Sequence, residues 1–133
     1  MHPIDHIGIA VNDLEASIKM YQETFGYEVD EREILEKSGV ELVFLKAPNT
    51  LLELLRPLND QSPIAKFLAK RGQGIHHICF RVPDIEAELK KLADQGVELI
   101  DKTPRPGAYN SKIAFIHPSS TDGTLIELCQ REV

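Results

Sequence analysis

The chain has 133 residues, of which 42% are hydrophobic and 27% charged, a composition typical of one globular domain. Its net charge of −6 lacks the basic excess that nucleic-acid binding needs. No apolar stretch approaches the roughly 18–20 residues of a membrane helix. The first residues show no secretory signal, and two cysteines are too few for a disulfide scaffold. We therefore expect a single cytoplasmic domain over 1–133 that binds neither nucleic acid nor membrane.

An internal repeat runs through the chain. Residues 4–17 match residues 75–88 at seven of 14 positions, with an offset of 71. Residues 50–54 match residues 124–128 at four of five positions, with an offset of 74. Both matches occur in the same order in the two halves, so we predict two copies of one structural module.

Each module is expected to consist of a strand, a helix and then three strands. The first module covers about 1–57 and the second about 75–133. A bridge over about 58–74 contains a short helix from Ser62 to Arg71, with a proline in its first turn.

The helices of the two modules have start and stop signals. Asp13 and Asp84 are expected N-caps, and Gly26 and Gly96 suit the left-handed conformation that ends a helix. A proline-containing loop is expected over 103–111. The expected strands cover about 4–11, 27–35, 40–47 and 50–56 in the first half, and about 75–82, 97–101, 112–117 and 124–130 in the second.

Four polar side chains lie in strands whose other face is apolar. His6 and His77 are equivalent in the repeat, as are Glu53 and Glu127. If the modules pack about a pseudo-twofold axis, these four groups converge and suit a divalent ion such as Co²⁺, Ni²⁺, Mn²⁺, Fe²⁺ or Zn²⁺. His76 is the alternative to His77, and both the repeat register and the strand alternation favour His77.

The quartet and several motifs resemble the vicinal oxygen chelate superfamily, which has the glyoxalase and bleomycin-resistance fold, and within it the methylmalonyl-CoA epimerase family. The motifs are Ile4–Val11, Tyr21–Gly26, Glu53–Leu58, Ser62–Leu68, Gly74–Cys79, His117–Pro118 and Gly123–Leu128. The resemblance implies an α+β fold in which two tandem βαβββ modules form a cup-shaped mixed sheet around a metal, with helices outside. It also implies a homodimer and a divalent metal cofactor, with Co²⁺ favoured.

The same resemblance implies an isomerase that inverts C2 of methylmalonyl-CoA between its (R) and (S) forms. The metal would stabilise the enolate that forms when the C2 proton leaves. Glu127 resembles a ligand that doubles as a base. Glu41, on the strand face that carries Val43 and Leu45, is the candidate base for the other side of C2. A solvated glutamate at a strand end is the alternative interpretation of Glu41.

The loop before the strand at 112–117 is the expected binding segment for the acyl-CoA substrate, because phosphates bind to cationic side chains and to backbone N–H groups. Its candidate residues are Arg105, Gly107, Asn110, Ser111 and Lys112. Scattered solvated charges are the alternative interpretation, and Arg56 or Arg81 could serve instead.

Two other functions stay open at this point. One is a lactoylglutathione lyase that isomerises a glutathione hemithioacetal. The other is a non-catalytic protein of the same fold that binds a small molecule.

Overall fold

The structure is a computed structural model that describes residues 1–132. The chain divides into two compact units. The N-terminal unit is His6–His76, and the C-terminal unit combines Met1–Asp5 with the residues from His77 onward. Among the described residues, every helix is too short or too polar to cross a membrane.

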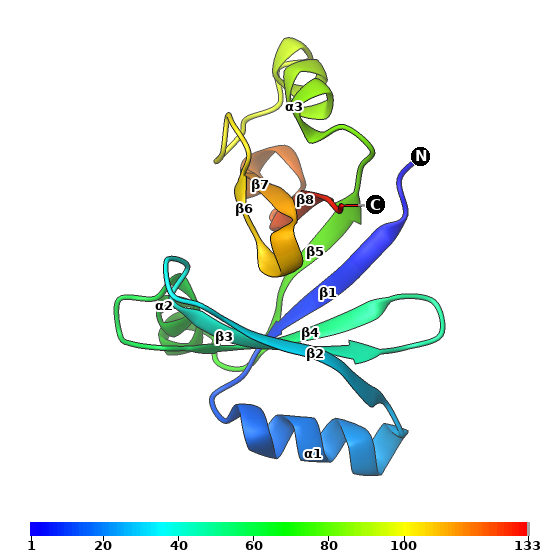
Figure 1. Ribbon diagram of the computed structural model, residues 1–133. Coiled ribbons are helices and arrows are strands. Elements are labelled where there is room, and N and C mark those ends of the chain that lie inside the picture. The colour runs from blue at the N-terminus through cyan, green and yellow to red at the C-terminus, as the bar shows by residue number, and fades with distance from the viewer. Residues whose placement is uncertain (133) are drawn as a thin grey trace. The chain divides into compact units, whose positions relative to one another are not determined.

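The N-terminal unit is built on strands in the order β2-β3-β4-β1. β1 and β4 run parallel, whereas β2–β3 and β3–β4 are antiparallel. α1 lies along one face of these strands, and α2 contacts β4 (Figure 1). The elements are β1 (Ile4–Ala10), α1 (Leu14–Phe25), β2 (Glu28–Leu35), β3 (Val40–Lys46), β4 (Leu51–Pro57) and α2 (Pro63–Arg71).

The C-terminal unit repeats this plan, with strands in the order β5-β8-β7-β6. β5 and β8 run parallel, and the other neighbours are antiparallel. α3 packs on one face of β7 and β8 (Figure 1). The elements are β5 (Gly74–Arg81), α3 (Ile85–Asp94), β6 (Arg105–Pro106), β7 (Lys112–Ile116) and β8 (Ile126–Gln130), with short 3-10 turns at Ala108–Asn110 and Pro118–Ser120.

Apolar residues on one side of each strand set hold the helix in place. In the N-terminal unit, Leu14 and Ile18 of α1 pack against strand residues that include Val43, Leu45 and Leu54. In the C-terminal unit, the corresponding α3 residues pack against alternate residues of β7 and β8. Strand side chains alternate between faces, so the residues between these contacts point to the face opposite the helix.

The predicted α+β class with two tandem βαβββ modules is confirmed, but the strand predicted over 97–101 was wrong. In that segment Leu99 forms only an isolated bridge to Ile116. The backbone N–H of Phe115 donates to the side-chain carboxylate of Asp101 at 2.8 Å, and not to a backbone carbonyl as in a regular strand pair. The additional strand is β6, within the predicted loop.

The units differ from the predicted modules at two places. The bridge helix α2 belongs to the N-terminal unit, and residues 1–5 belong to the C-terminal unit. The backbone N–H of Arg81 donates to the carbonyl of Pro3 at 3.0 Å. The first residues of module one therefore complete the unit that module two builds.

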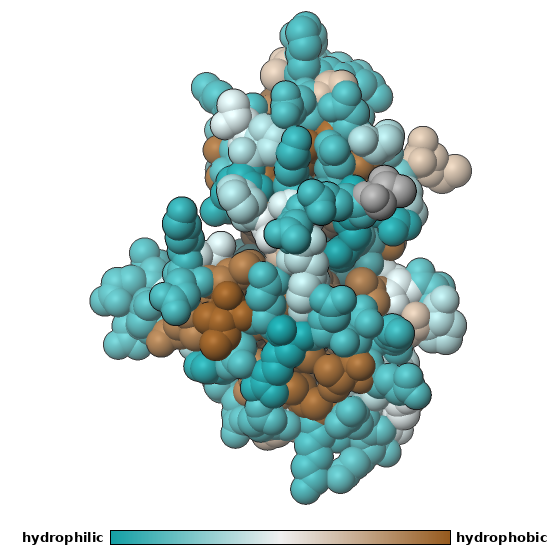
Figure 2. Space-filling view, viewed as in Figure 1, coloured by the Kyte–Doolittle hydropathy of each residue, from teal (hydrophilic) through white to brown (hydrophobic). Residues whose placement is uncertain are grey.

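Polar side chains cover most of the face shown in Figure 2, with apolar patches between them. The exposed large apolar side chains of the N-terminal unit are Met20, Phe25, Val29, Ile34 and Ile75. Phe25 forms an aromatic cluster with Tyr21 and Tyr27, at centroid distances of 5.9 and 6.1 Å. This cluster links the end of α1 to the start of β2.

Both predicted N-caps are confirmed, because Asp13 and Asp84 accept the backbone N–H groups of Ala16 and Ala87, each at 3.1 Å. We expect Asp13→Ala and Asp84→Ala each to lower the free energy of unfolding by about 1 kcal/mol. Asp13→Asn and Asp84→Asn keep the accepting oxygen and are the matched controls. Urea unfolding followed by circular dichroism measures the difference, and equal losses in the Ala and Asn variants would contradict the capping role.

Candidate metal and active site

β1 and β4 bring one histidine and one glutamate together in the N-terminal unit. Nε2 of His6 lies 3.4 Å from Oε1 of Glu53, and both side chains are buried. Leu52 and Leu54 flank Glu53 and pack toward α1, so Glu53 points to the opposite face. His6 and Glu53 therefore share the strand face that lies away from α1.

The C-terminal unit contains the equivalent pair. Nε2 of His77 in β5 lies 3.3 Å from Oε1 of Glu127 in β8, and both side chains are buried. Ile126 and Leu128 flank Glu127 and belong to the core cluster with α3. Each predicted ligand thus lies beside a partner in its own unit, on the face opposite the helix.

These donor groups fit a divalent cation. Each unit supplies an imidazole nitrogen and a carboxylate oxygen in a buried setting. Both are ligand types that first-row divalent metals accept. A buried carboxylate costs free energy unless hydrogen bonds or a cation compensate for its lost hydration. The buried pairs therefore have the chemistry expected of metal ligands.

Two phenylalanines beside these histidines were missed by the sequence reasoning. The ring of Phe44 contacts His6 at a centroid distance of 5.3 Å, and that of Phe115 contacts His77 at 5.8 Å. The offset of 71 that relates the two histidines also relates the two phenylalanines. The repeat therefore carried a signal that could have found them.

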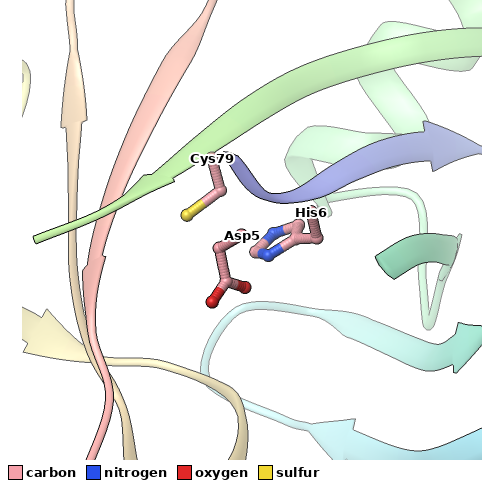
Figure 3. Close-up of side chains that lie close together, drawn as sticks. All are labelled: Asp5, His6 and Cys79. Carbon is pink, nitrogen blue, oxygen red and sulfur yellow. The ribbon is translucent and has the colours of Figure 1, made fainter. Parts of the chain in front are cut away.

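A buried carboxylate and a thiol lie close together in the C-terminal unit. Figure 3 shows Asp5 at the start of β1 and Cys79 in β5. Both oxygens of Asp5 accept hydrogen bonds from Arg131, each at 2.7 Å. Burial raises the pKa of the Cys79 thiol, and the neighbouring Cys129 and Glu127 raise it further, so the thiol stays neutral. The Asp5 carboxylate thus forms an ion pair with Arg131, which ties the start of β1 to the end of the chain's last strand.

Glu41 lies on the other face of the N-terminal strands. It lies on the same face of β3 as Val43 and Leu45, which pack in the α1 cluster, whereas His6 and Glu53 face away from that helix. The structure thus does not bring Glu41 to the face that carries His6.

Two arginines hold the Glu41 carboxylate. Nε of Arg32 donates to Oε2 at 3.0 Å, and Nε of Arg56 donates to Oε1 at 2.7 Å. Arg32 also pairs with Glu15 of α1. Burial raises the pKa of Glu41, but the hydrogen bonds from Arg56 and Arg32 outweigh this effect and hold the pKa below its ordinary value. These contacts weigh against Glu41 as a proton acceptor, and its role as a base stays a prediction.

The predicted substrate loop begins at Arg105, beside Phe115, whose ring contacts His77. The guanidinium of Arg105 lies 5.3 Å above the ring of Phe115, and its Nε lies 3.4 Å from Asp101. Lys112 lies on the same face of β7 as Ala114 and Ile116, which pack against α3, and its Nζ lies 3.9 Å from Glu86 of α3. The structure therefore brings Arg105, but not Lys112, toward the His77 side.

Close packing and a strained backbone shape the rest of this loop. A Cβ at Gly107 would lie 2.5 Å from Cγ2 of Ile113, so a larger residue does not fit there. Tyr109 and Asn110 both adopt positive φ angles, of 54° and 60°. Ser111 is buried, and its carbonyl accepts the Gly107 N–H at 2.9 Å. Close packing and the Gly107–Ser111 hydrogen bond thus connect the two ends of this loop.

Comparison with known protein families identifies the fold. Residues 5–115 match the family model of the glyoxalase/bleomycin resistance protein/dioxygenase superfamily. The chain belongs to this superfamily. The membership agrees with the two βαβββ modules and with the resemblance seen in the sequence.

Several superfamily members that resemble the chain are epimerases. The chain is 42% identical over 129 residues to the ethylmalonyl-CoA/methylmalonyl-CoA epimerase of Cereibacter sphaeroides, and the match covers 96% of each chain. The crystal structure of methylmalonyl-CoA epimerase from Mycobacterium tuberculosis is 41% identical, with a TM-score of 0.95 over 98% of this chain and 89% of that chain. A methylmalonyl-CoA epimerase in complex with methylmalonyl-CoA and NH₄⁺ is 38% identical, with a TM-score of 0.96 over 100% of this chain and 96% of that chain. The protein therefore shares its fold with isomerases.

The ion pairs of Glu41 predict a pH-dependent contribution to stability. The folded pKa lies below the unfolded value of about 4.3, so the contribution is present above that pH and is lost as the pH falls through the folded pKa. At pH 7 we expect Glu41→Gln to lower the free energy of unfolding by roughly 1 kcal/mol, because the partner arginines are partly exposed.

Urea unfolding of the wild type and of Glu41→Gln across the acid range measures this dependence. The two proteins should converge in stability at low pH. Glu23→Gln, at an exposed position of α1, is the matched control. A stability difference that does not change with pH would contradict the assignment.

Proposed function

We propose that the protein is a metal-dependent methylmalonyl-CoA epimerase that interconverts the (R) and (S) forms at C2. The observation that carries the proposal is the buried His–Glu pair present in each unit. The chain in which these pairs occur resembles methylmalonyl-CoA epimerases over nearly its whole length.

The four ligands of the proposed ion are His6, Glu53, His77 and Glu127. Co²⁺ is the favoured metal, and Zn²⁺, Ni²⁺, Mn²⁺ and Fe²⁺ suit the same donors. When bound, a divalent ion supplies positive charge against the negative charge that develops on the thioester oxygen as the C2 proton leaves.

The protein's own groups would move the proton. C2 lies next to a thioester carbonyl, which makes its proton weakly acidic. Glu127 is the proposed base on one side of C2, where its carboxylate takes the proton and can return one. Inversion needs a second acid–base group on the other side. Glu41 is the group predicted for that role, and its two arginine partners argue for a structural role instead.

The substrate would lie against the loop that begins at Arg105. The predicted binding residues are Arg105, Gly107, Asn110, Ser111 and Lys112, and the contact of Lys112 with Glu86 of α3 makes Lys112 the weakest of them. Arg105 is the strongest of them, because its guanidinium lies beside Phe115 and can reach an anionic group near His77. The close packing of Gly107 against Ile113 and Ser111 fixes the path of the loop backbone, so Gly107 would act through the shape of the loop.

Exchange of the C2 proton of methylmalonyl-CoA with deuterated solvent tests the reaction. We expect the metal-loaded wild type to catalyse exchange and His77→Ala to lose at least about 100-fold, because a ligand is removed. His76→Ala is the matched control, because neighbouring strand residues point to opposite faces and the His76 ring packs against Phe67.

Metal removal by a chelator should abolish exchange, and added Co²⁺ should restore it. Undiminished exchange by metal-stripped protein would overturn the metal-dependent mechanism. Turnover of the methylglyoxal–glutathione adduct, without exchange of methylmalonyl-CoA, would instead favour a lactoylglutathione lyase.

The acid–base assignment has its own test. Glu127→Gln should lower the exchange rate by about 100-fold or more, because the amide cannot accept the C2 proton. Glu41→Gln should leave exchange close to the wild-type rate, given the contacts of that carboxylate. Isotope exchange under single-turnover conditions measures both, and an equal loss in Glu41→Gln would identify Glu41 as the second base.

A further inference from the structure

Each histidine of the proposed metal site contacts one phenylalanine edge-on. The rings of His6 and Phe44 meet at an interplanar angle of 68°, and those of His77 and Phe115 at 88°. Both are T-shaped contacts, formed separately within the two units. The arrangement therefore occurs twice in the molecule.

The same phenylalanines lie opposite the glutamates in the strand register. Phe44 of β3 pairs with Glu53 of β4, and Phe115 of β7 pairs with Glu127 of β8. Residues directly opposite in antiparallel strands point to the same face. Each unit thus contains a His–Phe–Glu cluster in which phenylalanine borders both proposed ligands.

The internal repeat extends to these phenylalanines. Phe44 and Phe115 are separated by 71 positions, the same separation as His6 and His77. Other large apolar residues could fill the same volume in a core. Packing alone therefore does not explain why both positions carry an aromatic ring.

Ring geometry supplies that reason. Rotation of an imidazole about its Cβ–Cγ bond has broad minima, so packing must select the orientation that directs Nε2 toward the carboxylate. An edge-to-face aromatic contact has a preferred angle, whereas a leucine at the same position would permit several ring orientations. A ligand held in its binding orientation loses less conformational entropy when it binds.

We infer that Phe44 and Phe115 are positioning residues that fix the imidazoles of His6 and His77 for metal binding. The inference rests on the metal site of the proposed function. Neither phenylalanine needs to touch the ion, because each acts through the histidine that it contacts.

The two phenylalanines differ in what else they contact. Phe44 is 2% exposed and lies in the buried part of β3. Phe115 is partly buried and lies beneath the guanidinium of Arg105 at 5.3 Å. Phe115 therefore connects His77 to the proposed substrate loop, whereas Phe44 contacts His6 and belongs to the other unit.

Co²⁺ binding measured by titration calorimetry and by the visible spectrum of the bound ion tests the inference. Phe44→Leu and Phe115→Leu should each weaken Co²⁺ binding by about 10-fold and change the spectrum, because ligand orientation is lost. Phe115→Tyr keeps the aromatic ring and should therefore retain the wild-type affinity for Co²⁺. Val43→Ala removes buried volume from the opposite face of β3 and should lower stability without changing Co²⁺ affinity.

Steady-state kinetics separate the two phenylalanines. Phe115→Leu should also raise KM for methylmalonyl-CoA, because Arg105 loses the aromatic ring over which its guanidinium lies. Metal-saturated Phe44→Leu should keep KM near the wild-type value. Wild-type Co²⁺ affinity and spectra in both leucine variants would overturn the inference while leaving the proposed function intact. A wild-type protein that binds none of the candidate metals would overturn the metal site, and the inference with it.

Discussion

The burial of one carboxylate beside one imidazole in each unit is the constraint on which the rest of the structure depends. Glu53 and Glu127 are both about 95% shielded from solvent. Removing a carboxylate from water costs several kcal/mol unless a partner compensates for the lost hydration. The leucines and isoleucine on either side anchor each strand to its helix and direct the glutamate to the opposite face. The helix contacts therefore determine where the polar groups meet.

Two glutamates of the N-terminal unit show how the strand face decides chemistry. Glu53 and Glu41 lie in neighbouring antiparallel strands, and both are largely shielded from solvent. Glu53 lies beside a histidine, but Glu41 lies on the α1 side between two arginines. Because side chains alternate with a period of two, a shift of one residue exchanges these environments. Whether a glutamate here is a proposed metal ligand or the partner of arginines therefore depends on the strand face on which it lies, and not on its residue type.

The repeat was enough to predict the modules, the caps and the histidine–glutamate pairs, because duplication preserves both spacing and parity. Other features depended on information that periodicity does not hold. Phe44 and Phe115 have the hydrophobic character of core residues, so their contact with histidine is visible only in three dimensions. The arginine partners of Glu41 come from two other strands. Asp5 joins the C-terminal unit through Arg131, which is 126 positions away in sequence.

Duplication supplies equivalent proposed ligands, but the proposed acyl-CoA substrate is not symmetric, and the two units themselves are not identical. They differ in the connection between their second and third strands. In the N-terminal unit a short turn over 36–39 joins β2 to β3, whereas β6 and β7 are joined by the strained segment that contains Tyr109 and Asn110. Arg105 at the start of that segment lies over the aromatic neighbour of His77. The part of the duplication that the two units share therefore carries the proposed metal ligands, whereas the loop in which they differ carries the proposed substrate-binding residues.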